Sequence, residues 1–395
     1  MQTVDEWLAA ARLARQRNAP NEAASIIIDG LRQGKWGSYR LWNELWSLMR
    51  SPDDYARIRV LWLESSKKCH HRVPVLRTVA RAASVAGEHE DARHLLRKAI
   101  LRARGHQRRP TVQARRYSQR SMARARLWLP GQHRDAFSRR AHEALRDLNL
   151  ELSRLGVRGF LISGTLLGLV REGRFISWDK DIDLGFFTSE IVPEDLEMAF
   201  EQHPDFDVRR LDFSSDRMRV QHVNGMSIDV FPHYMDGDRV WHDGTTTRWW
   251  NRPFELRETE FLGESTFVPD HAEQYLDENY GEWQEPNPDF DARIDAPNVE
   301  VTDEVFLDTL LYFELLRAIA FARKVKIGRY RDLLRDRGEG DWLSRLLELL
   351  SGFLCCCGGV MWRLAALSPL AHTLQVFGRA KHPRYAMLLG HILWI

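Results

Sequence analysis

Residues 163–185 read SGTLLGLVREGRFISWDKDIDLG, and they carry the strongest indication of a fold in this chain. The segment opens on a Ser-Gly-Thr turn and ends with three aspartates at every second position, Asp179, Asp181 and Asp183. The sequence Asp-Ile-Asp-Leu alternates charged with apolar side chains, which is the period of a β-strand. Because residues two apart on a strand project from the same face, we expect these carboxylates to lie side by side.

Carboxylates this close repel one another, and the repulsion raises their pKa values. A divalent cation between them removes the repulsion, and hard carboxylate oxygens suit Mg²⁺ or Mn²⁺. Asp229, in the segment SIDVFP, lies on another predicted strand that a hairpin would place beside Asp181 and Asp183. Three convergent acids can hold metals that activate an attacking oxygen and neutralise phosphates. The sequence therefore predicts a metal site for phosphoryl transfer.

The turn before the aspartates has the composition of a phosphate-binding loop. In Ser163-Gly164-Thr165, the glycine lets the backbone approach a phosphate, and the hydroxyls and helix-start amides can donate to it. Arg171 and Arg174 follow on the predicted helix or just beyond it and are candidates for binding phosphate. Each feature alone also occurs in ordinary turns and solvated strand faces. Their order along the chain is what indicates nucleotidyl or phosphoryl transfer.

These motifs resemble the LicD/fukutin family of nucleotidyltransferase-fold phosphotransferases over about residues 140–290. The matching motifs are GTLLG (164–168), Arg171, FI (175–176), WD (178–179), DIDLG (181–185), IDVFP (228–232) and a weaker trailing set at 261–286. The resemblance implies transfer of a phosphorylated alcohol from a cytidine diphosphate donor to a sugar hydroxyl of a cell-surface glycan or its precursor. Phosphocholine, ribitol phosphate and glycerol phosphate are the groups that the family moves.

The resemblance also implies roles for individual residues. Asp181, Asp183 and Asp229 would be the catalytic metal ligands, and one of them would also be the general base on the acceptor hydroxyl. Asp179 would support a ligand through a hydrogen bond or, together with Trp178, orient the start of the strand. An ordinary core position for Trp178 stays open.

A tryptophan-rich segment follows the motifs and permits two interpretations. Trp241, Trp249 and Trp250 could present an aromatic face to a quaternary ammonium such as choline, or they could pack in the core.

The N-terminal residues 1–105 are predicted to be helical and repetitive. The segments around Ala24 and Ala92 are similar and lie 68 residues apart, twice the 34-residue tetratricopeptide period. We expect degenerate tetratricopeptide-like repeats that position an acceptor or a protein partner, and an unspecific helical bundle is the alternative. Residues 106–133 would be a basic linker, since no acid occurs between Arg93 and Arg134. The alternative for this tract is contact with an anionic surface.

From residue 134 the pattern is α/β up to about residue 300, and residues 301–395 are predicted to be helical. The fold class is therefore α+β, with a nucleotidyltransferase-like mixed sheet and flanking helices. The predicted elements are a helix at 137–155 ended by Gly156, strands at 157–162, 180–186, 208–212, 218–222 and 226–232, and helices at 166–170 and 195–202. Asn224-Gly225 is a strong hairpin turn between two of these strands.

Composition indicates which partners and which cellular compartment to expect for the protein. The formal net charge is +2, so nothing global indicates nucleic acid as a partner. Three of the four cysteines are adjacent, at Cys355, Cys356 and Cys357, which is a poor disulfide framework and indicates a reducing compartment. The N-terminus lacks the features of a signal peptide. We expect a cytoplasmic protein, with peripheral contact at the inner face of the membrane through the uncharged residues 349–362 as a further interpretation.

Two other functions stay open at this point. A nucleotidyltransferase that attaches a nucleoside monophosphate to a small molecule or protein would use the same Gly-Thr and Asp-x-Asp elements. A helical-repeat scaffold with an inactive transferase domain is the other alternative. Three mutually repelling acids argue against the scaffold, because an inactive domain has no chemical reason to keep them.

Overall fold

A computed structural model describes most of the first 339 residues. The described residues are 2–17, 19–65, 67, 69–108, 132–176, 181–210, 212–213, 215–287, 289–321, 323–339 and 342. Trp178, Asp179, most of the predicted basic linker and the uncharged segment 349–362 lie outside them. Residues 1–330 form one compact unit, and residues 331–395 are assigned to a second.

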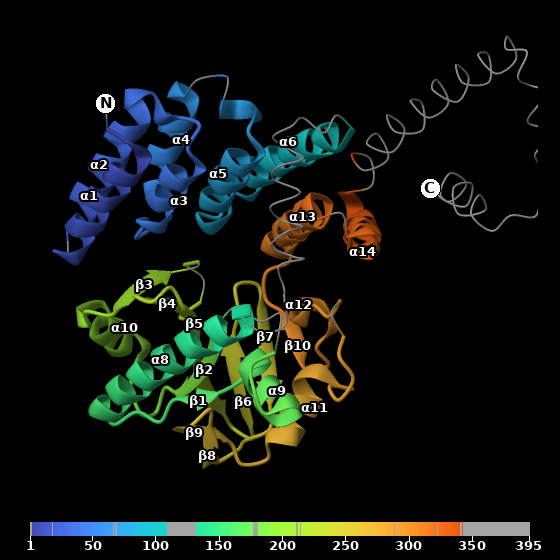
Figure 1. The fold of residues 1–395 in the computed structure, drawn as a ribbon. Coiled ribbons are helices and arrows are strands. Elements are labelled where there is room, and N and C mark those ends of the chain that lie inside the picture. The colour runs from blue at the N-terminus through green and yellow to red at the C-terminus, as the bar shows by residue number, and fades with distance from the viewer. Residues whose placement is uncertain are drawn as a thin grey trace, which may run out of the picture. The chain divides into compact units, whose positions relative to one another are not determined.

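The N-terminal part of the first unit consists of helices (Figure 1). Their bounds are α1 Val4–Gln16, α2 Pro20–Gly30, α3 Tyr39–Ser47, α4 Asp54–Glu64, α5 Val73–Val85 and α6 His89–Arg108, with short turns at Leu31–Lys35 and Cys69–His71. Helix α1 begins with a capping box, in which Thr3 and Glu6 satisfy each other's backbone amides. Helix α1 packs on α2, and α5 packs on α6. Ala24 and Ala92 are both buried, which allows close helix approach. The tetratricopeptide-like assignment stays a prediction.

A mixed sheet forms the second part of the unit. Its strands are β1 Phe160–Leu161, β2 Asp181–Phe187, β3 Phe206–Arg210, β4 Met218–His222, β5 Ser227–Asp236, β6 Arg239–Asp243, β7 Thr247–Asn251, β8 Leu256–Phe261, β9 Glu264–Pro269 and β10 Val299–Val301. Their order is β10-β7-β6-β5-β2-β1-β9-β8, and the β3–β4 hairpin also pairs with β5. Strands β2 and β5 are parallel, as are β1 and β9, whereas the other pairs are antiparallel. The α+β class with a mixed sheet is therefore confirmed.

Helix α8, Gln132–Leu155, lies against this sheet and contacts β9 and β2 (Figure 1). Ala141, Leu145, Leu148 and Leu152 are almost fully buried at helical spacing. The helix ends where the sequence predicts, because Gly156 adopts a left-handed φ of 73° that a Cβ would disfavour. The remaining helices of this part are α9 Ser163–Glu172, α10 Pro193–Gln202, α11 Ala272–Tyr280 and α12 Ala292–Asp295.

The chain then returns to the N-terminal helices. Helix α13, Glu304–Ala320, packs against α6 and α5, and its Leu311, Tyr312 and Leu315 are almost fully buried. Helix α14 follows at Lys324–Leu334. The N-terminal helices and the sheet belong to the same compact unit. The predicted division of the chain at residues 105, 133 and 300 stays a prediction.

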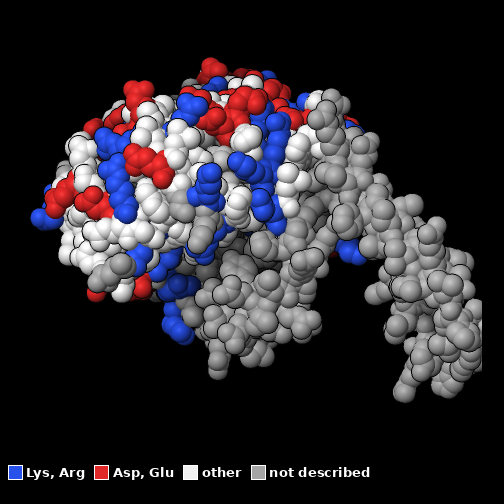
Figure 2. Space-filling model, turned by 90° about the horizontal axis from the view of Figure 1, so that it is seen from above, with Lys and Arg blue, Asp and Glu red and all other residues white. Residues whose placement is uncertain are grey.

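Two further observations concern the distribution of charge and the hydrophobicity of the helices. Basic and acidic side chains both occur over the face shown in Figure 2, as the small net charge leads one to expect. Among the described residues, no helix combines the length and the apolar character that crossing a membrane requires.

Candidate active site

The register of two parallel strands brings the predicted acids together. Asp183 of β2 lies directly opposite Asp229 of β5, and Asp181 lies opposite Ser227. Since paired residues and residues two apart share a face, the three carboxylates project from the same side of the sheet. Asp229 is buried, and Asp181 and Asp183 are partly buried. Ile182 lies between Asp181 and Asp183, and its strand partner Ile228 precedes Asp229; both isoleucines belong to the opposite face and are fully buried.

Arg219 of β4 is a site residue that the sequence analysis missed. It pairs with Asp229 across the β4–β5 ladder, and its Nε and Nη2 lie 2.5 and 2.6 Å from the two carboxylate oxygens of Asp229. Its Nη2 is also 3.4 Å from Asp181 Oδ2. Burial lowers the pKa of Arg219, but the hydrogen bonds to Asp229 and the charges of the aspartates outweigh burial and raise it. The guanidinium therefore neutralises part of the acidic face.

The Ser-Gly-Thr turn begins helix α9 and fixes the position of Asp183. The amide of Gly164 donates to Asp183 Oδ2 at 3.0 Å, and the amide of Asp183 donates to Thr165 Oγ1 at 2.9 Å. Ser163 adopts a φ of 48°, an uncommon left-handed conformation for a residue other than glycine. The turn thus contacts the carboxylate and the backbone of Asp183. Phosphate binding by Ser163, Gly164 and Thr165 stays a prediction.

The two arginines predicted to bind phosphate lie at the end of α9 and just beyond it. Arg171 is largely buried and donates to the carbonyl of Trp283 at 3.1 Å, and it also pairs with Glu172 at 3.2 Å. Arg174 pairs with the same glutamate at 3.4 Å and is half exposed. These contacts attach α9 to the loop after α11. The phosphate role of both arginines stays a prediction.

Tyr275 of α11 also belongs to the surroundings of Asp183. Its hydroxyl is buried and has no hydrogen-bond partner among the described residues. Burial raises the pKa of Tyr275, and the charges of Asp183 and Glu278 raise it further. The trailing motif of the sequence contained this tyrosine, but nothing in its spacing indicated that it approaches the aspartates.

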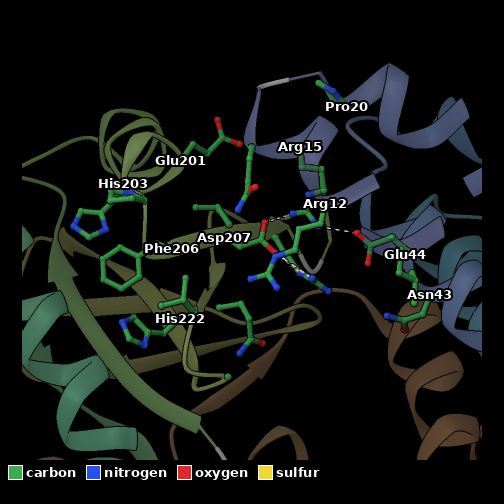
Figure 3. Close-up of a pocket in the computed structure, with 18 of the residues that line it drawn as sticks. Arg12, Arg15, Pro20, Asn43, Glu44, Glu201, His203, Phe206, Asp207 and His222 are labelled. Atoms are coloured by element: carbon green, nitrogen blue, oxygen red, sulfur yellow. Dashed lines mark hydrogen bonds and ion pairs between the residues drawn. The ribbon is translucent and has the colours of Figure 1, made fainter. Parts of the chain in front are cut away.

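A cavity of about 620 Å³ borders the acidic face through Arg219. It is lined by Asn43, Trp46, Arg77, Thr78, Arg81, Arg217, Arg219, Gly244, Thr245, Thr247, Trp249, Arg293, Leu310, Phe313, Glu314 and Arg317. A larger cavity of about 1280 Å³ lies between α1, α3, α10 and the β3–β4 hairpin, where Arg15 contacts Glu44 and Asp207 (Figure 3). None of the three aspartates lines either cavity. The smaller cavity adjoins the candidate site through Arg219, which lines it and contacts Asp229 and Asp181.

The three aspartates have the chemistry of ligands for a divalent metal, but their carboxylates are not arranged around a common metal position in this structure. No group of three histidine, cysteine, aspartate or glutamate side chains in the described part of the chain is arranged to hold a metal ion. Asp181 and Asp229 instead share the guanidinium of Arg219. Three carboxylates on one face are the hard oxygen ligands that Mg²⁺ or Mn²⁺ requires. Metal binding would have to displace Arg219 from Asp229.

The tryptophans that could present an aromatic face to a quaternary ammonium contact side chains of the protein itself, and Trp241 contacts a guanidinium. The guanidinium of Arg248 lies 3.6 Å from the ring centroid of Trp241. Trp249 stacks on His242, and Trp250 donates to Glu300 at 2.8 Å. These contacts are a cation–π interaction and structural packing.

The sequence of this region matches the model of the LicD/FKTN/FKRP nucleotidyltransferase domain over residues 156–271. These residues are a LicD/FKTN/FKRP domain. The domain contains Ser163-Gly164-Thr165, the three aspartates and Arg219, so the family match covers the site described above.

Known relatives agree with this assignment. The chain is 32% identical over 173 residues to the mouse (Mus musculus) protein named ribitol-5-phosphate transferase FKTN, and the match covers 42% of this chain and 37% of the mouse protein. It is 31% identical over 178 residues to the human (Homo sapiens) protein of the same name, covering 42% of this chain and 38% of the human protein. The match thus spans well under half of these relatives.

Proposed function

We propose that the chain is a metal-dependent transferase that moves a phosphorylated alcohol from a CDP-activated donor to a sugar hydroxyl of a cell-surface glycan or its precursor. The observation that carries this proposal is the pairing of Asp183 with Asp229, with Asp181 on the same face, inside a LicD/FKTN/FKRP domain. The names of the mouse and human relatives favour ribitol phosphate as the transferred group, with phosphocholine and glycerol phosphate as alternatives.

The proposed reaction gives each charged group of the site a role. The acceptor hydroxyl oxygen attacks the phosphorus that carries the alcohol, a new P–O bond forms, the P–O bond to cytidine monophosphate breaks, and a carboxylate of the aspartate set accepts the hydroxyl proton. Bound Mg²⁺ or Mn²⁺ would be held by Asp181, Asp183 and Asp229 and would neutralise diphosphate charge. The Gly164 amide and the Thr165 hydroxyl hold Asp183 in position for this role. Arg219 supplies a positive charge at the same face.

Calorimetry with CDP-ribitol, CDP-glycerol, CDP-choline and ATP, first with Mg²⁺ and then with chelator, tests the proposal. We expect one cytidine donor to bind in a metal-dependent manner, and CMP and a phosphorylated glycan to form when an acceptor is added. Preference for ATP would instead support the nucleotidyltransferase alternative. Absence of any metal-dependent nucleotide binding would support the scaffold alternative.

A further inference from the structure

Helix α5 of the N-terminal region contributes two arginines to the cavity beside the aspartates. Arg77 and Arg81 are four residues apart, so they lie on the same face of the helix, and both line the 620 Å³ cavity. The same cavity is lined by Arg219, which binds Asp229 and Asp181. Side chains of the helical region therefore share one cavity with the candidate active site.

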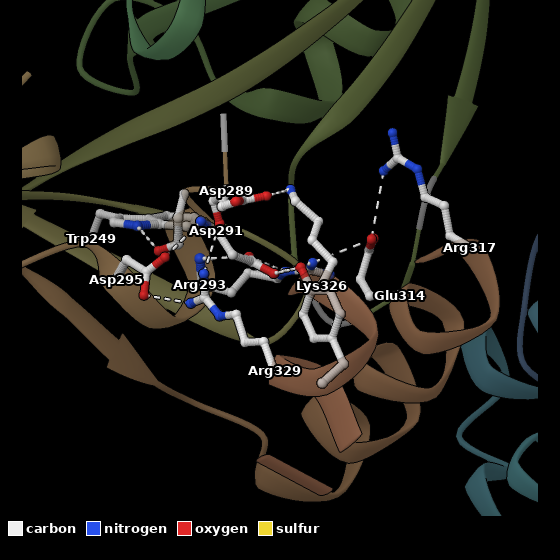
Figure 4. Close-up of polar contacts among 11 residues, drawn as sticks. Trp249, Asp289, Asp291, Arg293, Asp295, Glu314, Arg317, Lys326 and Arg329 are labelled. Atoms are coloured by element: carbon white, nitrogen blue, oxygen red, sulfur yellow. Dashed lines mark hydrogen bonds and ion pairs between the residues drawn. The ribbon is translucent and has the colours of Figure 1, made fainter. Parts of the chain in front are cut away.

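The described lining of this cavity is strongly positive, with six arginines and one acid, Glu314. Some of these arginines have carboxylate partners. Arg293 forms a bidentate pair with Asp291 and lies 3.5 Å from Glu314, which also approaches Arg317 at 3.6 Å (Figure 4). Arg217 donates to Thr245 at 2.8 Å and lies 3.8 Å from Asp212. Among the described lining residues, Arg77 and Arg81 are therefore the arginines for which no ion pair with a carboxylate is found.

Arg81 has no such partner. No hydrogen bond or ion pair joins it to a carboxylate within the described ranges, and its guanidinium lies 5.8 Å from the ring centroid of Phe313. Burial lowers the pKa of Arg81 to about 10, and the positive charge of Arg217 contributes to the shift. The charge of Asp212 opposes this shift, but no hydrogen bond or ion pair joins Asp212 to Arg81. A partly buried guanidinium that faces other guanidinium groups without a directly bound anion is unfavourable. An anionic ligand in the cavity would remove this cost.

We propose that this cavity binds a phosphate or diphosphate group of the transferase substrates, with Arg77 and Arg81 of the helical region as direct ligands. The inference rests on the proposed function and assigns part of the substrate site to the N-terminal helices. Planar guanidinium groups bind phosphate oxygens in pairs, which a cluster of arginines from α5, β4 and α13 can provide. The cavity volume lies in the usual range for small-molecule sites. The anion belongs to the diphosphate of the donor or to a phosphate on the acceptor.

Binding of inorganic pyrophosphate to the full-length protein tests the proposal directly. Calorimetry is done with chelator and at low ionic strength, so that metal at the aspartates does not contribute and charges are not screened. We expect Arg81→Gln to weaken binding by about tenfold or more, as the loss of one charged hydrogen-bond partner predicts, and Arg77→Gln to weaken it in the same direction. The matched control is Arg57→Gln, because Arg57 is exposed on α4 and does not line the cavity.

Unchanged pyrophosphate affinity in both cavity variants, or an equal loss in Arg57→Gln, would overturn the proposal. Thermal unfolding confirms that each variant is folded, and exposed Arg77 provides a readout even if Arg81→Gln is unstable. A raised KM for the CDP donor would assign the anion to the donor diphosphate, whereas a raised KM for the acceptor alone would assign it to an acceptor phosphate. Specific pyrophosphate binding without transfer from any CDP donor would refute the proposed function and leave the anion site standing.

Discussion

Three carboxylates on one face of β2 and β5 repel one another unless a positive charge lies among them, and in this structure Arg219 supplies that charge. The sequence indicated the aspartates because their spacing is strictly alternating. Arg219 could have been found as well. It lies five residues before Asn224, as Asp229 lies five residues after it, so a hairpin centred on that turn pairs the two. The contacts of Arg171 with Trp283 could not have been predicted, because they join segments far apart in the sequence.

At the residue scale, Asp183→Asn should abolish transfer. The asparagine keeps the size of the side chain and an oxygen that can accept from the Gly164 amide, so the fold should survive. It loses the charge that would hold a metal, and we expect the rate to fall by about a thousandfold or more. The rate of CMP release with donor and acceptor measures this. The control is Asp238→Asn in the exposed turn between β5 and β6, which should keep full activity. Full activity in Asp183→Asn would exclude this residue from the site.

Arg219→Gln should make the stability of the protein depend on Mg²⁺. Without the guanidinium, the aspartates lose their counter-charge, and we expect the free energy of unfolding in chelator to fall by about 2 kcal/mol. Metal that binds only the folded state then restores stability, so the rise in Tm on adding Mg²⁺ should be larger than in the wild-type protein. Thermal unfolding with and without Mg²⁺ measures both effects. An equal rise in Tm in both proteins would show that Arg219 and the metal do not compete.

At the element scale, predicted and observed strand bounds agree where the burial pattern alternates. Strand β4 was predicted with its observed bounds, because it alternates buried and partly buried residues. Strand β5 continues four residues beyond the predicted end at 232, where His233 is buried but Met235 and Asp236 are exposed in the hairpin with β6. Strand β3 begins two residues before the predicted 208. Strands β6 to β10 were not predicted; the pairings of β9 with β1 and of β10 with β7 join segments that are distant in the sequence.

Gly185 of β2 illustrates this tertiary constraint. A Cβ at this position would lie 2.5 Å from Phe160 Cε2 and 2.8 Å from His233 Cε1, in the centre of the sheet. Gly185→Ala should therefore destabilise the protein by about 1–3 kcal/mol through overpacking. The matched control is Gly328→Ala in α14, where a Cβ meets nothing within 4 Å and helix propensity favours alanine. Urea unfolding of both variants should give opposite signs, and a neutral Gly185→Ala would contradict the packing described here.

At the scale of the whole molecule, the N-terminal helices pack against a helix that follows the sheet in the chain. Helix α13 follows the LicD domain in the chain but buries its side chains against α5 and α6, and Arg97 Nε donates to Tyr312 at 3.1 Å. The division at residue 105 stays a prediction from local patterns, and long-range packing such as that of α13 leaves no local pattern in the sequence. Deleting these residues would expose the apolar face of α13. Point variants such as Arg77→Gln are therefore the better test of what the helical region contributes to the substrate site.

The stability of the folded unit should fall between pH 6.5 and 4 because of a buried histidine pair. His233 and His242 stack at 4.5 Å between ring centroids, and both are buried. Burial lowers the pKa of His233 from 6.5 to about 4 and that of His242 well below 6.5. The unfolded chain therefore binds protons in this pH window while the folded protein does not, so acidification favours unfolding. His233 alone should cost about 2.5 kcal/mol at pH 4.5 relative to pH 7.

Urea unfolding at pH 7 and pH 4.5 measures this loss, and His233→Phe separates it from the contribution of the carboxylates. The variant removes the titrating ring, so its loss of stability on acidification should be smaller than that of the wild-type protein by about the same 2.5 kcal/mol. His271→Gln is the control, because His271 is exposed and should leave the pH dependence unchanged. If His233→Phe lost as much stability on acidification as the wild-type protein, His233 would have to be protonated in the folded state, and an unpaired charge would then lie in the centre of the sheet.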